Sequence, residues 1–111
     1  MDDLMKIVNE IVEKNPWLSG MVDFLDGDIM AIVNIPEKFR AVVEFDDLKT
    51  LYLNLKNYDG VYKYKNLLFF SDWQYGIFVY DINDEDRGHY VEHLSKSISF
   101  ERFKKVVEKL T

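Results

Sequence analysis

The sequence predicts an α+β protein: an antiparallel β-meander of about six to eight short strands, with an amphipathic helix at each end of the chain. Apolar residues recur at helical spacing near both termini, whereas between them apolar and polar residues alternate and turn dipeptides recur. With 111 residues, the chain is expected to form a single domain spanning residues 1–111.

The first predicted helix covers residues 3–14. Asp2 or Asp3 can cap its start, and Pro16 prevents its continuation beyond Asn15. Its apolar stripe follows the helical period and consists of Leu4, Ile7, Val8, Ile11 and Val12.

Four strands are expected in the first half of the chain. Asp26-Gly27 is a typical tight-turn dipeptide and predicts a hairpin of strands 20–25 and 28–35. Alternating residues predict two further strands at 39–45 and 50–56, with Asp46-Asp47 as the turn between them.

The second half predicts strands at 61–65, 67–71, 75–82 and 89–95, then a helix. The run Leu67–Phe70 has no polar alternate and predicts a central strand that is covered on both faces. Ser99 can cap the last helix, whose apolar stripe is Phe100, Phe103, Val107 and Leu110. The simplest arrangement places both terminal helices on one face of the sheet.

Charge and composition restrict the classes of function. The formal net charge is −6, and residues 1–55 hold 11 acidic against 5 basic residues, whereas residues 56–111 hold 9 of each. An excess of acids opposes phosphate binding, so we expect no nucleic-acid partner and favour a basic protein partner. No apolar run is long enough for a membrane span, and the chain has no cysteine, which together suit a cytoplasmic protein.

The stretch YDINDEDRGHYVEH, residues 80–93, concentrates acids and histidines. Asp81, Asn83, Glu85 and Glu92 follow the ligand spacing of a calcium loop, so a looser calcium site is one interpretation. Asp86 stands where an EF-hand loop requires glycine, and no helix is expected on either side, which excludes a true EF-hand.

Two other interpretations of this stretch remain open. His89, Glu92 and His93 spell H-x-x-E-H, a zinc-peptidase pattern. On a strand Glu92 would point away from both histidines, so a metal contact by the two histidines without catalysis is favoured over a zinc peptidase. The third interpretation is a solvated loop between two strands, since Asn, Asp and Gly tolerate turn conformations. We favour the loop first and an ion site second.

Contact residues for a protein partner are expected among exposed acids and aromatics. Tyr62 and Tyr64 alternate with lysines and are expected on the wetter face of their strand, while Trp73 in a turn either folds back on the sheet or anchors a partner. The expected acidic contacts are Asp26, Asp28, Asp46 and Asp47.

The segments FFSDWQYGIFVYDIN and SISFERFKKVVEKL together resemble the later part of SUKH-type immunity domains, where strands lead to a terminal helix. The first half departs from that pattern, because strands are expected after NIPEKF where the family places a helix. The resemblance implies an immunity role.

No catalytic motif occurs, so we expect a small, non-enzymatic module that docks onto a basic protein as an inhibitor, immunity or anti-defence factor. No cofactor is expected under this hypothesis. The alternative is a calcium- or metal-binding module that uses residues 81–92. The oligomeric state and a small-molecule pocket are left open.

Overall fold

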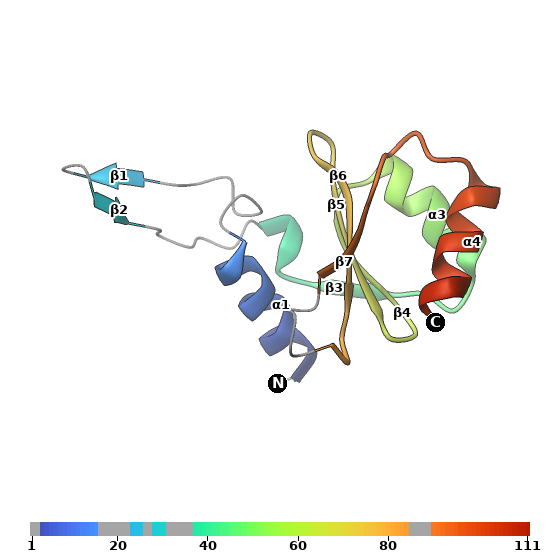
Figure 1. Cartoon of the computed structure of the whole chain (residues 1–111), viewed down its shortest axis with the longest axis horizontal. Coiled ribbons are helices and arrows are strands. Elements are labelled where there is room, and N and C mark those ends of the chain that lie inside the picture. Colours follow the sequence, from blue (N-terminus) through green and yellow to red (C-terminus); the bar gives the residue numbers. More distant parts are fainter. Residues whose placement is uncertain (1–2, 16–22, 26–27, 31–36, 85–89) are drawn as a thin grey trace.

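The computed structural model describes residues 3–15, 23–25, 28–30, 37–84 and 90–111. It is an α+β fold in which helices cover both faces of a five-stranded sheet of order β3-β4-β5-β6-β7 (Figure 1). The elements are α1 (Asp3–Lys14), β1 (Asp23–Leu25), β2 (Asp28–Met30), the 3₁₀ turn η1 (Glu37–Phe39), β3 (Val42–Glu44), α3 (Leu48–Asn57), β4 (Gly60–Tyr64), β5 (Leu67–Asp72), β6 (Gly76–Asp81), β7 (Tyr90–Leu94) and α4 (Phe100–Leu110).

The middle strand, β5, is buried along its whole length, as the unbroken apolar run predicts. Leu67 and Phe69 point to one face, where they contact the core beneath α3 and α4. Leu68 and Phe70 point to the other face and contact the core beneath α1. Both faces of this strand therefore need a cover.

The two terminal helices lie on opposite faces of the sheet, so the expectation that they share one face is wrong (Figure 1). Val8, Ile11 and Val12 of α1 pack with η1 and the sheet in one core. Phe103 and Val107 of α4 pack with α3 in the other. The molecule thus has three layers, with the sheet in the middle.

Residues 48–57 form helix α3 and not the strand expected at 50–56. The buried side chains Leu51, Tyr52 and Leu55 follow the helical period, whereas Leu53, which a strand would place beside Leu51 and Leu55, is 47% exposed. Asp47 caps this helix by accepting a hydrogen bond from the backbone N–H of Thr50 at 3.0 Å, so it begins a helix and does not form a hairpin turn.

Because a helix connects them, β3 and β4 run parallel, with Val42 opposite Val61 and Glu44 opposite Lys63. The other neighbours, β4 to β7, pair antiparallel as expected. The predicted all-antiparallel meander of six to eight strands is therefore replaced by a mostly antiparallel sheet of five. The strand expected at 39–45 is shortened to β3, with η1 before it.

The hairpin expected around Asp26-Gly27 is present as the antiparallel pair β1–β2, with Leu25 opposite Asp28. It forms a two-stranded sheet that is separate from the main one. Asp26 itself lies outside the described residues. The two terminal helices and the Ser99 cap are confirmed, and the strands expected at 61–65, 67–71, 75–82 and 89–95 are present with slightly different ends as β4, β5, β6 and β7. In the described part of the chain, no helix has the length and apolarity needed to cross a bilayer.

The hydroxyl of Tyr80 is buried in the core beneath α1 and has no hydrogen-bond partner among the described residues. Burial raises the pKa of Tyr80 well above its ordinary value, with a smaller contribution from Tyr90. The equivalent group of Tyr52, on the other face, donates to the carbonyl of Ile98 at 2.6 Å.

We expect Asp47→Ala to lower the melting temperature, because the first turn of α3 then loses the acceptor for the Thr50 N–H. Asp46→Ala removes the neighbouring carboxylate, which is also exposed, and is the matched control. Thermal unfolding followed by circular dichroism checks both variants. Equal melting temperatures for the two variants would contradict the capping role.

Tyr80→Phe is expected to leave the free energy of unfolding unchanged or to raise it by up to about 1 kcal/mol, because an unpaired buried hydroxyl is removed. Tyr52→Phe is the control and should lose about 1 kcal/mol, because it leaves the Ile98 carbonyl unpaired. Urea unfolding measures both values. A larger loss in Tyr80→Phe than in Tyr52→Phe would show that the Tyr80 hydroxyl is bonded.

Candidate binding surface at the 73–75 turn

Among the expected contact residues, Tyr64, Asp46 and Asp47 lie at one end of the sheet and Trp73 lies at the other. Tyr64 ends β4, and the hydrogen bond from Phe45 N–H to the Lys63 carbonyl places the segment that leads to Asp46 and Asp47 beside it. Trp73 follows β5, whose chain runs antiparallel to β4, and therefore lies at the other end. The structure does not bring Trp73 together with the acidic pair.

Tyr62 is only 5% exposed and belongs to the core beneath α3 and α4. The expectation that it lies on the wetter face of β4 is therefore wrong. Burial raises the pKa of Tyr62, with smaller contributions from Asp59 and Tyr58, and its hydroxyl donates to the Tyr58 carbonyl at 3.1 Å. The sheet face that carries Tyr62 is covered by α3, whose residues the sequence predicts as a strand.

Trp73 is 76% exposed in the turn between β5 and β6, so it does not fold back on the sheet. Tyr75, in the same turn, is 44% exposed, and Tyr58, which follows α3, is 65% exposed. Tyr58 precedes β4 by two positions and Trp73 follows the paired Ser71 by two, so both extend the β4–β5 pair at the same end. Three large aromatic side chains thus face solvent at one end of the sheet.

The turn that carries Trp73 is built by Asp72. Its Oδ1 atom accepts hydrogen bonds from the backbone N–H groups of Gln74 at 2.8 Å and Tyr75 at 3.1 Å, which fixes the turn backbone. Gly76 closes the turn with φ +98°, a conformation that side chains rarely adopt. A Cβ atom at this position would also lie 2.7 Å from the Leu94 carbonyl oxygen, so the turn and β7 approach too closely for a larger residue.

Asp72 also belongs to a chain of ion pairs across this end of the molecule. Lys38 of η1 binds both Asp72 and Asp59, the latter at 3.4 Å, and Lys96 binds Asp59 at 3.0 Å. The four side chains come from η1, the α3–β4 connection, β5 and the β7–α4 connection, and each is between 12% and 29% exposed. Partly shielded pairs of this kind are screened less than surface pairs, so they help to hold four segments together.

The pKa of Asp72 lies below its ordinary value. Burial alone would raise it, but the hydrogen bonds from Lys38 and from the backbone of Gln74 and Tyr75 together outweigh that effect. The ionised carboxylate is therefore the form that holds the turn.

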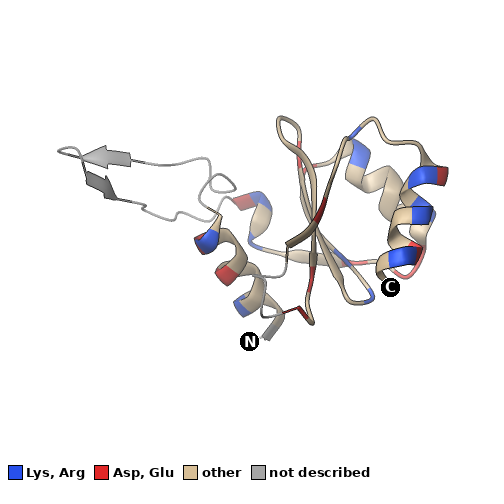
Figure 2. Ribbon diagram, viewed as in Figure 1, with Lys and Arg blue, Asp and Glu red and all other residues tan. Residues whose placement is uncertain are grey.

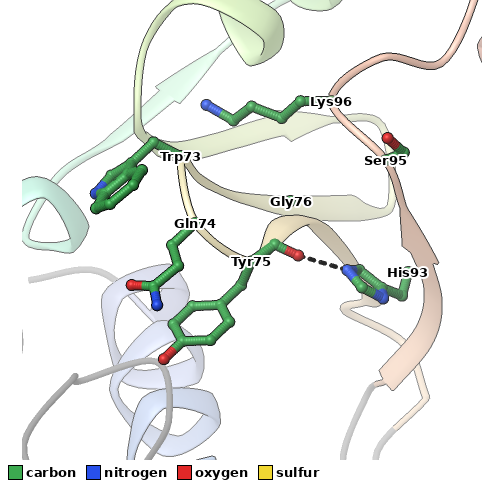
Figure 3. A pocket seen from close by; sticks show the side chains of 7 residues that line it. All are labelled: Trp73, Gln74, Tyr75, Gly76, His93, Ser95 and Lys96. Carbon is green, nitrogen blue, oxygen red and sulfur yellow. Dashed lines mark hydrogen bonds between the residues drawn. The ribbon is translucent and has the colours of Figure 1, made fainter.

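A shallow pocket of about 470 Å³ lies between this turn and the end of β7 (Figure 3). Its lining residues are Trp73, Gln74, Tyr75, Gly76, His93, Ser95 and Lys96. His93 lies across from the turn, and its Nε2 atom donates to the Tyr75 carbonyl at 2.6 Å, since a carbonyl can only accept. The His93 ring is stacked on Phe78 with centroids 4.1 Å apart, so both contacts hold the imidazole in place.

Charge is unevenly distributed over the described part of the chain (Figure 2). Bases gather on α4, whose charged residues are Arg102, Lys104, Lys105 and Lys109 against Glu101 and Glu108. Asp47 has its pKa lowered by its hydrogen bonds with the Thr50 side chain and backbone, so its carboxylate is engaged in capping α3. Asp46 is exposed, and Asp28 begins β2.

The candidate calcium ligands are only partly described. Asp81 ends β6, where its Oδ1 atom accepts from the Asn83 N–H at 2.9 Å and from the Asn66 side chain at 3.2 Å. Glu92 is exposed in the middle of β7, opposite Val79. Glu85 and His89 lie outside the described residues, and within those residues no group of three or more His, Cys, Asp or Glu side chains could hold a metal ion. The calcium site remains a prediction.

Comparison with protein-family models, curated proteins and solved structures found no match for this chain. The likeness of its later strands and last helix to SUKH-type immunity domains thus remains a resemblance.

Sequence reasoning identified Trp73 but missed the residues that support it. Lys38, Asp59, Asp72 and Lys96 are far apart along the chain, and each is an ordinary surface residue in its local context. The only local sign is Asp72 itself, because an aspartate carboxylate often accepts a hydrogen bond from the backbone N–H two residues later and so stabilises a turn.

We expect Asp72→Asn to lower the free energy of unfolding near neutral pH by about 1 to 2 kcal/mol, because the ion pair with Lys38 is lost. A carboxyl whose pKa is depressed in the folded state stabilises the fold above its unfolded pKa and loses that effect as pH falls. The difference between wild type and Asp72→Asn should therefore shrink below about pH 4. Urea unfolding across this range measures it, and a difference independent of pH would contradict the assignment.

Proposed function

We propose that this chain is a non-catalytic protein-binding module of the cytoplasm, which docks onto a basic protein as an inhibitor, immunity or anti-defence factor does. The observation that carries the proposal is Trp73, a large apolar side chain 76% exposed on a turn that is fixed on both sides. Exposed tryptophans on pre-organised loops are typical anchors of protein interfaces.

The rigidity of the turn favours binding because less conformational entropy is lost when a partner contacts it. Asp72 fixes the backbone around Trp73. The Asp72 carboxylate is itself held by Lys38, which also pairs with Asp59. The shallow pocket beside Trp73 offers aromatic surface, an imidazole and hydroxyl groups, which suits part of a protein surface better than an enclosed small molecule.

Charge has a separate role in the proposal. The net charge of −6 raises the rate of encounter with a basic protein through long-range attraction, which salt weakens. Because Asp46 and Asp47 lie at the opposite end from Trp73, we assign steering to the acids and short-range contact to the aromatic end.

The test uses the immobilised protein and a lysate of its source organism, washed at low and at moderate salt, with mass spectrometry of what is retained. We expect one basic protein whose retention falls as salt is raised. Trp73→Ala should weaken the affinity for this protein roughly thirtyfold, equivalent to about 2 kcal/mol. Leu53→Ala is the control, since Leu53 is also a large exposed apolar residue, 47% exposed, but lies on α3.

Circular dichroism should show the same melting temperature for wild type and Trp73→Ala, because the side chain is exposed. If every retained protein binds Trp73→Ala as well as wild type, the 73–75 turn is not the contact surface. If no protein is retained specifically at either salt, the module does not act by docking.

A further inference from the structure

Strand β7 forms one edge of the five-stranded sheet, and no strand in the described part of the chain pairs with its outer side. The N–H of His93 donates to the carboxylate of Glu92, its own neighbour, at 3.3 Å. In an antiparallel ladder, alternate residues direct their N–H and C=O groups to the neighbouring strand or away from it. The bond to a side chain places His93 among the residues that point outward, where another strand can pair.

The side chains of β7 divide between the two faces of the sheet. Glu92 lies opposite Val79, on the face covered by α3 and α4, and is exposed. His93 lies opposite Phe78 and stacks on it, on the face covered by α1. A strand added beyond β7 would therefore place one side chain beside Glu92 and the next beside His93.

Both faces of this edge are hollowed. The pocket between Trp73, Tyr75, Gly76 and His93 lies on one side. A second hollow, lined by His93, Leu94, Ser95, Ser97, Ile98 and Arg102, lies on the side of α4 and shares His93 and Ser95 with the first. The first pocket lies beside the open strand, as in sheet edges that bind extended peptides, whereas the second contains Arg102 and not Glu92, so we place no basic side chain in it.

We propose that an extended segment of the partner adds to β7 as a further strand, with a lysine or arginine beside Glu92 and an apolar or aromatic side chain beside His93, in the pocket of Trp73. This inference rests on the proposed function and gives the chemistry of the partner segment. The peptide backbone supplies a carbonyl for the His93 N–H, and the Glu92 carboxylate turns from that N–H to the incoming cation.

The charge of Glu92 also selects against another occupant. Two copies of this chain that paired edge to edge around Glu92 would bring two carboxylates directly opposite each other, which is destabilising. A cationic residue at the same place gains from the contact. In that register, Glu92 favours a basic segment over a second copy of β7.

The probe is a phage-displayed library of random linear peptides, selected on the wild-type protein. We expect enriched peptides with Lys or Arg directly next to an apolar or aromatic residue. Glu92→Lys should weaken the best synthetic peptide at least about fivefold, because an attraction becomes a repulsion. Glu108→Lys makes the same charge change at an exposed position on α4 and should leave the affinity within about twofold.

Hydrogen exchange followed by NMR separates strand addition from other contacts. The His93 N–H should exchange more slowly when the synthetic peptide is bound, because the peptide carbonyl then accepts from it. Melting temperatures of Glu92→Lys and Glu108→Lys, compared with wild type, show that both variants are folded.

Any one of four results would overturn the inference. These are a selection without enriched peptides, enriched peptides without a basic residue, equal binding to wild type and Glu92→Lys, and a His93 N–H that is not protected in the complex. None of these results decides the proposed function, which the lysate experiment with Trp73→Ala tests separately. If binding of the partner depends on Trp73 but not on Glu92, the docking function stands and the added strand is ruled out.

Discussion

The burial of β5 on both faces is the constraint on which the rest of the structure depends. Leu67 and Phe69 on one side and Leu68 and Phe70 on the other cannot face water without losing the main stabilisation of the fold. One layer of helices can cover only one of these faces. The chain therefore places α1 on one side and α3 with α4 on the other, and the three-layer arrangement follows.

The sequence predicts helices and strands well in segments where the apolar residues follow only one period, either that of a helix or that of a strand. The stripe of α1, the cap and stripe of α4, and the strands β4 to β7 follow directly from their patterns. Residues 48–57 are ambiguous, because Leu51 and Leu55 satisfy both the strand and the helix period. Tyr52, which a strand would expose, decides for the helix because it packs against Phe100 and Phe103 of α4, a contact that lies far away in the sequence.

That one element accounts for most of the other errors. A helix in place of a strand makes β3 and β4 parallel, covers the face that holds Tyr62, and turns Asp47 into a cap. Of the candidate surface, the sequence predicts only Trp73, because a turn does not require a large aromatic side chain. Its supports, Lys38, Asp59 and Lys96, become neighbours through tertiary folding and leave no local pattern.

The order of the strands in the sheet is the same as their order along the chain, and this has a consequence for how the protein folds. Each strand from β4 to β7 pairs with the strand before it in the chain, so the paired segments are near one another in the sequence and little chain entropy is lost at each step. Helix α1 is different, because Val8 belongs to the same core as Leu68, Phe70 and Tyr80, which lie far from it in the sequence. The sheet with α3 and α4 can thus form from nearby segments, and the docking of α1, which closes the longest loop, is expected to be the last and slowest step.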